Sequence, residues 1–152
     1  MMTKEPTGKV KMKKIMLIAA IIASTFAQNI FAQASNNQPI NKVLTAYLNL
    51  KNALSADDAK AASTSAKTML DEISKVPMVK MTADQNATWM KYTKKLYFDA
   101  SHISEVAELE HDREHFMSLS KNMYSVIKAF HSSAPLYYQF CPMANDDKGA
   151  YW

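Results

Sequence analysis

A long stretch without proline or glycine constrains the fold of this chain more than any other feature of its sequence. From about residue 83 to about residue 130, apolar side chains recur at helical spacing and neither helix-breaking residue occurs. A single helix of that length would extend over about 70 Å, which is too long for a compact domain of this size. The stretch therefore predicts two helices, with a break between Asp99 and Ala107 where Ser101 and Ser104 can cap.

Two further helices are predicted before this stretch. Pro39 suits the first turn of a helix, because its missing N–H is not needed there. Ser55 followed by Asp58 has the spacing of a helix N-cap, and Thr82 followed by Gln85 fits a capping box before the third helix. Four helices with short connections predict an all-α fold, a four-helix up-and-down bundle. The apolar residues that form its predicted stripes include Val43, Tyr47, Leu50, Leu54, Ala59, Ala62, Ala66, Met69, Ile73, Val76, Trp89, Tyr92, Leu96, Ala100, Ile103, Leu109, Phe116, Met123, Ile127 and Phe130.

The segment after residue 131 has a different character. Residues 135–141 are β-prone, residues 145–149 are turn-forming, and residues 150–152 can return as a second strand. We expect this β-hairpin-like segment, which carries Cys141, Pro142 and Met143, to pack on the bundle, because an isolated hairpin is only marginally stable in water. A larger β fold is excluded because Gly8 and Gly149 are the only glycines available for tight turns.

The charges are divided unevenly between the N-terminus and the remainder of the chain. The net charge is +4, and residues 1–34 account for all of it with five lysines and one acidic residue. The remaining 13 basic side chains are matched by 13 acidic ones. Binding to nucleic-acid phosphates requires a clustered positive surplus, so the sequence argues against a nucleic-acid partner.

Residues 1–34 have the organisation of a secretory signal peptide. A lysine-rich segment precedes residues 15–27, which carry no charge and are too few for a spanning helix of about twenty residues. The A-x-A pattern that follows predicts cleavage after Ala34, with Ala32 as the alternative, and Met12 is an alternative initiator. The mature protein is then a single helical domain, residues 35–152. We expect it to be exported without a membrane anchor, to the periplasm in a Gram-negative host.

His111 and His115 are the first candidate metal ligands. Their i, i+4 spacing places both imidazoles on one helix face, where they can bind one ion at about 2.0–2.1 Å from each nitrogen. Glu108 lies on the same side and can add an oxygen ligand. His102 is half a turn out of phase and can join the pair only if the helix breaks between them. The alternative is an ordinary solvated helix surface.

Cys141 and Met143 are the second candidate. A thiolate and a thioether close together favour a soft ion, Cu(I) above all, and Pro142 fixes the backbone between them. If the hairpin faces the histidines, Cys141→Ser should remove most of the Cu(I) affinity, and a histidine-to-alanine change should cost less. The alternatives are a cysteine buried beside Tyr138 and Phe140, or an intermolecular disulfide.

The sequence gives little indication of catalysis. It contains no glycine-rich phosphate loop, no paired carboxylates and no serine elbow, and no base lies near Cys141 in sequence. Arg113 lies close to the apolar stripe, so we expect it to form a structural ion pair with a carboxylate, such as that of Asp99 or Asp112. We therefore predict a non-enzymatic domain, with a thiol-dependent enzyme as the less favoured alternative.

Several motifs of the mature chain resemble a known family. They are Tyr47-Leu48-Asn49-Leu50-Lys51-Asn52-Ala53-Leu54 with Asp57-Asp58, His102-Ile103, Glu110-His111-Asp112-Arg113-Glu114-His115-Phe116 with Leu119-Ser120, and Tyr137-Tyr138-Gln139-Phe140-Cys141-Pro142-Met143 with Gly149-Ala150-Tyr151-Trp152. Over about residues 40–152 the chain is similar to a family of exported bacterial proteins defined as a domain of unknown function. Members of that family occur alone or attached to the periplasmic adaptor subunits of heavy-metal efflux pumps.

The resemblance implies a helical fold, export and an association with copper-type metal handling. Members of the family continue beyond the position of Trp152 to a second cysteine, so the resemblance also implies that this chain is truncated at its C-terminus. The polar positions that match the family are His102, His111, Arg113, His115, Cys141 and Met143.

The motifs and the resemblance together predict an exported periplasmic domain that binds a soft metal ion, copper, in metal resistance or efflux. The predicted partner is a heavy-metal efflux adaptor. The alternative is a structural or interaction module that docks on such an adaptor or on a second copy of itself, with no metal site. The predicted metal ligands are Cys141, Met143, His111, His115 and His102.

We predict that the exported protein begins at Ser35. Signal peptidase cleaves after small residues, and Ala32 and Ala34 provide them. Mass spectrometry of the protein recovered from the periplasmic fraction tests this directly. A chain that retains Met1 or Met12 in the membrane fraction would contradict the prediction.

Overall fold

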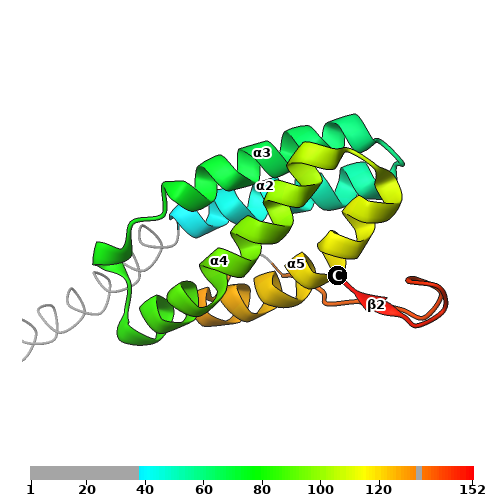
Figure 1. The fold of residues 1–152 in the computed structure, drawn as a ribbon. Helices are drawn as coiled ribbons and strands as arrows, with labels where there is room; N and C mark the ends of the chain where they lie inside the picture. Colours follow the sequence, from blue (N-terminus) through cyan, green and yellow to red (C-terminus); the bar gives the residue numbers. More distant parts are fainter. Residues whose placement is uncertain (1–37, 133–134) are drawn as a thin grey trace, which may run out of the picture. The chain divides into compact units, whose positions relative to one another are not determined.

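The protein is a helical domain with a short C-terminal hairpin, seen in a computed structural model that describes residues 38–132 and 135–152 (Figure 1). The predicted helical fold with four helices and a hairpin is confirmed. The predicted signal peptide, residues 1–34, lies outside the described residues. The elements are α2 (Gln38–Ser55), α3 (Ala59–Ser74), the 3₁₀ helix η1 (Met78–Lys80), α4 (Ala83–Val106), α5 (Leu109–Phe130), β1 (Phe140–Cys141) and β2 (Ala150–Tyr151).

Successive helices run in opposite directions and pack side by side (Figure 1). Each helix contacts the next one in the sequence, and α2 also contacts α5, which closes the bundle. Tyr47 of α2 stacks on Phe116 of α5 with ring centroids 5.3 Å apart, and its hydroxyl donates a hydrogen bond to Ser120 at 3.0 Å. In the described part of the chain, no helix combines the length and apolar character that crossing a bilayer requires.

Side-chain caps define the starts of α3 and α4. The Asp58 carboxylate accepts a hydrogen bond from the Ala61 backbone N–H at 2.9 Å, so Asp58 itself is the N-cap of α3, and Ser55 ends α2. The predicted capping box of α4 is confirmed, because Thr82 and Gln85 exchange side-chain-to-backbone hydrogen bonds at 3.3 and 3.1 Å.

The break between α4 and α5 lies at the C-terminal edge of the predicted interval. Ala107 adopts a left-handed conformation with φ of +53°, and Glu108 is the N-cap of α5. The prediction that Ser101 and Ser104 cap this break is wrong, since both lie inside α4. The Ser104 hydroxyl donates to the Ser101 carbonyl at 2.8 Å, and a serine bonded to the preceding turn is tolerated within a helix.

The C-terminal hairpin packs on the bundle through its second strand. β1 and β2 are antiparallel, with Cys141 paired to Ala150, and Trp152 packs against the core. The connection requires glycine at position 149, where φ is +80° and an added Cβ would lie 2.3 Å from Cζ of Phe140. Tyr138, which precedes β1, stacks on Tyr124 of α5 with ring centroids 4.3 Å apart. This contact holds the segment before the hairpin against α5.

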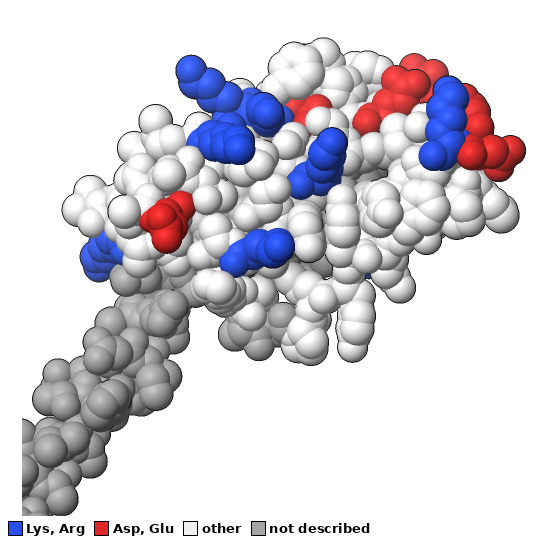
Figure 2. Space-filling view, turned by 90° about the horizontal axis from the view of Figure 1, so that it is seen from below, with Lys and Arg blue, Asp and Glu red and all other residues white. Residues whose placement is uncertain are grey.

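Charged side chains do not form a continuous basic surface on the face shown in Figure 2. Lysine and arginine side chains are dispersed over that face between uncharged residues, and most of the acidic side chains in view lie toward one end. This distribution agrees with the balanced charge of the chain after residue 34.

Replacing Leu96 by alanine should lower the free energy of unfolding by about 2–5 kcal/mol, because Leu96 is completely buried in the core and its truncation leaves a cavity. Lys94→Ala, an exposed change on the same helix, is the control and should alter stability by less than about 0.5 kcal/mol. Urea unfolding followed by circular dichroism measures both. Equal stabilities of the two variants would contradict the packing described here.

Candidate metal centre

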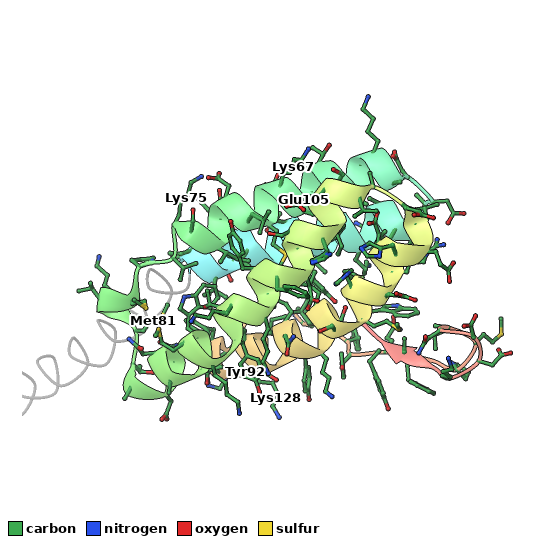
Figure 3. The ribbon with its side chains drawn as sticks, in the orientation of Figure 1. Lys67, Lys75, Met81, Tyr92, Glu105 and Lys128 are labelled. Atoms are coloured by element: carbon green, nitrogen blue, oxygen red, sulfur yellow. The ribbon has the colours of Figure 1, made fainter. Side chains whose placement is uncertain are left out.

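The three histidines come from two helices that meet at a tight connection. His102 lies in the last turns of α4, and His111 and His115 lie in the first two turns of α5. Only residues 107–108 connect these helices, so the end of α4 lies beside the start of α5 (Figure 1). This is the end of α4 that Glu105 marks in Figure 3. The condition for His102 to join the pair, a break in the helix, is therefore met.

The three imidazole rings pack into one cluster. The ring centroid of His102 lies 4.4 Å from that of His115 and 5.8 Å from that of His111. The centroids of the two α5 histidines are 4.6 Å apart, and one nitrogen from each of the three rings lies within 4.8 Å of the others. Nitrogens bound to one tetrahedral ion lie about 3.3 Å apart, so side-chain rotations that move each nitrogen by about 1 Å complete the geometry.

A buried carboxylate orients one of these rings. Asp99 is 3% exposed, and its Oδ1 lies 3.2 Å from Nδ1 of His115. A hydrogen bond from Nδ1–H to this carboxylate leaves the Nε2 lone pair of His115 available to an ion, as in the carboxylate–histidine pairs of metal proteins. Asp99 precedes His102 by three residues, so one turn of α4 supplies both a ligand and an orienting group.

A second buried carboxylate belongs to Asp112. Its side chain is completely buried, and neither carboxylate oxygen makes a hydrogen bond of normal geometry. Burial raises the pKa of the Asp112 carboxyl, while the nearby Glu108 backbone and the two α5 histidines oppose that rise. The Nε2 atom of His111 is also buried without a hydrogen-bond partner. An ion in the cluster would satisfy the buried His111 nitrogen, whereas the Asp112 carboxylate lies outside the group of three ligand atoms.

Phe98 covers part of the cluster on its solvent side. Its ring centroid lies 4.5 Å from that of His102 and 5.8 Å from that of His115, and the side chain is 56% exposed. The three histidines are each partly exposed. An ion can therefore reach the cluster from solvent beside an aromatic ring.

The structure does not bring Cys141 and Met143 to the histidines. The hairpin lines a pocket with Arg113 and Met117 of α5. Glu110, Glu114 and Phe116 of α5 also line this pocket, so the hairpin packs along the side of α5 centred on Arg113 and Met117, and Cys141 is not part of the histidine cluster. Cys141 is a half-buried free thiol, and Met143 is 78% exposed in the turn.

One sequence expectation about this region is wrong, and another is confirmed with a different partner. Glu108 is exposed and does not contribute an oxygen to the cluster. Arg113 donates a hydrogen bond to the Leu54 carbonyl at 2.8 Å and forms an ion pair with Asp57, instead of pairing with either buried aspartate. The reason is its direction, because Arg113 points from α5 toward the connection between α2 and α3.

Sequence reasoning missed the two aspartates as members of the site, since it considered them only as ion-pair partners of Arg113. The Asp99-x-x-His102 spacing is a signal that could have identified the first, because residues three apart lie on one helix face. The burial of Asp112 depends on how α5 packs and has no comparable local signal.

Asp112→Asn should increase the free energy of unfolding of the metal-free protein near pH 7 by about 1–3 kcal/mol, because an unpaired carboxylate is costly to bury. The folded-state pKa lies above the ordinary value of 3.8, so the wild type loses stability as pH rises through it. The difference between variant and wild type should therefore shrink below about pH 4. Urea unfolding with a chelator present measures it, with exposed Glu114→Gln as the control. A variant less stable than the wild type near pH 7 would contradict the prediction.

Comparison with known proteins identifies the family. A family model described as "Protein of unknown function (DUF3347)" matches residues 43–134, which include the three histidines and both buried aspartates but not Cys141 or Met143. The searches of curated proteins and of solved structures found no match. The resemblance noted from the sequence is thus confirmed as far as a domain of unknown function. Because the match covers more than half of the 152 residues, the chain belongs to the DUF3347 family.

Proposed function

We propose that this protein is a non-enzymatic metal-binding domain in which His102, His111 and His115 hold one transition-metal ion. The observation that carries the proposal is the meeting of three imidazoles from two helices, with one nitrogen of each within 4.8 Å of the others. One of these histidines is also oriented by a buried carboxylate, which is a common arrangement for metal-binding histidines.

Copper is the ion that we propose. Imidazole donors suit copper, zinc, nickel and iron, and among divalent ions of this series copper binds most tightly to a given nitrogen site. The family resemblance of the sequence to proteins of heavy-metal efflux points in the same direction. The thiolate and thioether of the hairpin are not needed for this site, so the proposed ligands are three nitrogens.

The cellular role follows from the predicted export. A domain in the periplasm with a partly exposed site can take up an ion from solvent and release it again, which suits metal resistance or efflux. A periplasmic adaptor subunit of a heavy-metal efflux pump is the partner that we propose. The helix pair α4–α5 would hold the ion. The part of the bundle surface that the hairpin does not cover would be available to the adaptor.

A second candidate function is an interaction module without a metal. It is favoured by the aromatic side chains of the C-terminal segment, since Tyr137 is 82% exposed and Phe140 is 52% exposed. Exposed aromatic residues are enriched at protein interfaces. Metal binding by the wild type and its loss in histidine variants distinguish the two functions.

His111→Ala should weaken Cu²⁺ or Zn²⁺ binding by at least about a hundredfold, because it removes one of three ligands, whereas loss of an outer hydrogen-bond partner costs about tenfold to a hundredfold. Cys141→Ser is the matched control and should leave the affinity unchanged, since the thiol lies outside the cluster. Competition titration against a chromogenic chelator measures both. Equal affinity in wild type and His111→Ala would contradict the proposed function.

A further inference from the structure

We infer that the three-histidine site selects a divalent over a monovalent ion, and that Asp99 and Asp112 supply the two negative charges that balance it. This inference rests on the proposed function and adds the charge of the ion. It also gives a role to two residues that neither the sequence motifs nor the family match explains.

The first argument is the distribution of buried charge. Among the described residues, Asp99 and Asp112 are the only acidic side chains that are buried, and no lysine or arginine is buried. Both buried acids lie at the histidine cluster and nowhere else in the core. Buried charges are stable in proteins only when they are paired with an opposite charge or bound to a metal.

The second argument is proximity along the helices. Asp112 follows His111 directly and precedes His115 by three residues, a spacing that brings side chains to within about 5–6 Å at their Cβ atoms. Asp99 contacts His115 across the helix pair at 3.2 Å and precedes His102 by one turn. Each helix therefore supplies one carboxylate beside its own histidine ligand.

The third argument is that the Asp112 carboxylate is poorly compensated, since only the nearby Glu108 backbone and the histidines themselves offset its burial. Asp99 is at least hydrogen-bonded to a histidine, but both oxygens of Asp112 lack a hydrogen bond of normal geometry. A carboxylate in this position destabilises the metal-free fold, so packing does not account for its presence. A positive ion in the neighbouring cluster would compensate the charge of this carboxylate without binding to it directly.

Counting charge then specifies the ion. Neutral imidazoles contribute no charge, and two carboxylates contribute two negative charges, so a divalent ion brings the buried site to neutrality and a monovalent ion leaves one charge uncompensated. The electrostatic attraction to each carboxylate is proportional to the charge of the ion, and it is weakly screened because both carboxylates are buried. Removing one carboxylate should therefore reduce the logarithm of the affinity about twice as much for a divalent ion.

The test compares Zn²⁺ with Ag⁺ on the full chain carrying Cys141→Ser, because the free thiol would otherwise bind Ag⁺. Neither ion changes oxidation state during a titration. Asp112→Asn keeps the shape of the side chain and removes its charge. It should weaken Zn²⁺ binding by about a hundredfold and Ag⁺ binding by about tenfold. Glu114→Gln removes a charge from an exposed position next to His115 and should change neither affinity by more than about twofold, since solvent screens it.

Asp99→Asn is the second variant, because an asparagine oxygen can still accept the hydrogen bond from His115 while the charge is lost. Asp99→Asn should also lower the logarithm of the Zn²⁺ affinity about twice as much as the logarithm of the Ag⁺ affinity. Circular dichroism establishes that each variant is folded. Equal losses for Zn²⁺ and Ag⁺, or no loss for either in the folded variants, would overturn the inference and leave the proposed function intact. A Cys141→Ser chain that binds neither ion would overturn both.

Discussion

The reversal of the chain at Ala107 and Glu108 is the constraint on which the site depends. In a continuous helix, His102 would lie half a turn away from the face that carries His111 and His115. A left-handed residue at position 107, with φ of +53°, ends α4 and lets α5 return beside it. An alanine in that conformation costs about 1–2 kcal/mol, so the packing of α4 against α5 must stabilise the turn by more than this amount. The same packing places the two ends of the helices, and hence all three imidazoles, within reach of one another.

The two buried aspartates give this end of the bundle a different character from the rest of the core. Elsewhere the interior is apolar or contains neutral side chains that can hydrogen-bond locally, as the Tyr47 hydroxyl does with Ser120. At the histidine cluster the interior contains negative charge without a buried basic residue. Local sequence rules and structure agree least at this end, because nothing in the local pattern of α5 marks position 112 as buried.

The helices could be predicted from the sequence because apolar periodicity and capping residues are local signals. Thr82 and Gln85 form a capping box across four consecutive positions, and Gly149 meets the backbone requirement of its own turn. Both signals involve only residues close together in the sequence. The location of the α4–α5 break was harder, since no glycine marks the left-handed position. The separation of Cys141 from the histidines was beyond local reasoning, because it depends on which side of α5 the hairpin packs against.

The ligands predicted from the sequence included a cysteine and a methionine, whereas the proposed site has three histidines. This difference changes the kind of ion that the site would favour. Cysteine and methionine donors would favour a soft monovalent ion, whereas the proposed site of three imidazoles beside two carboxylates would favour a borderline divalent ion. A bound ion would also join the last turn of α4 to the first turns of α5, across the strained residue at position 107. Since a ligand that binds only the folded state stabilises it, an ion would strengthen the turn that creates its own site. The metal-free domain, in which the Asp112 oxygens lack hydrogen bonds of normal geometry, would then be less stable toward unfolding than the metal-bound domain.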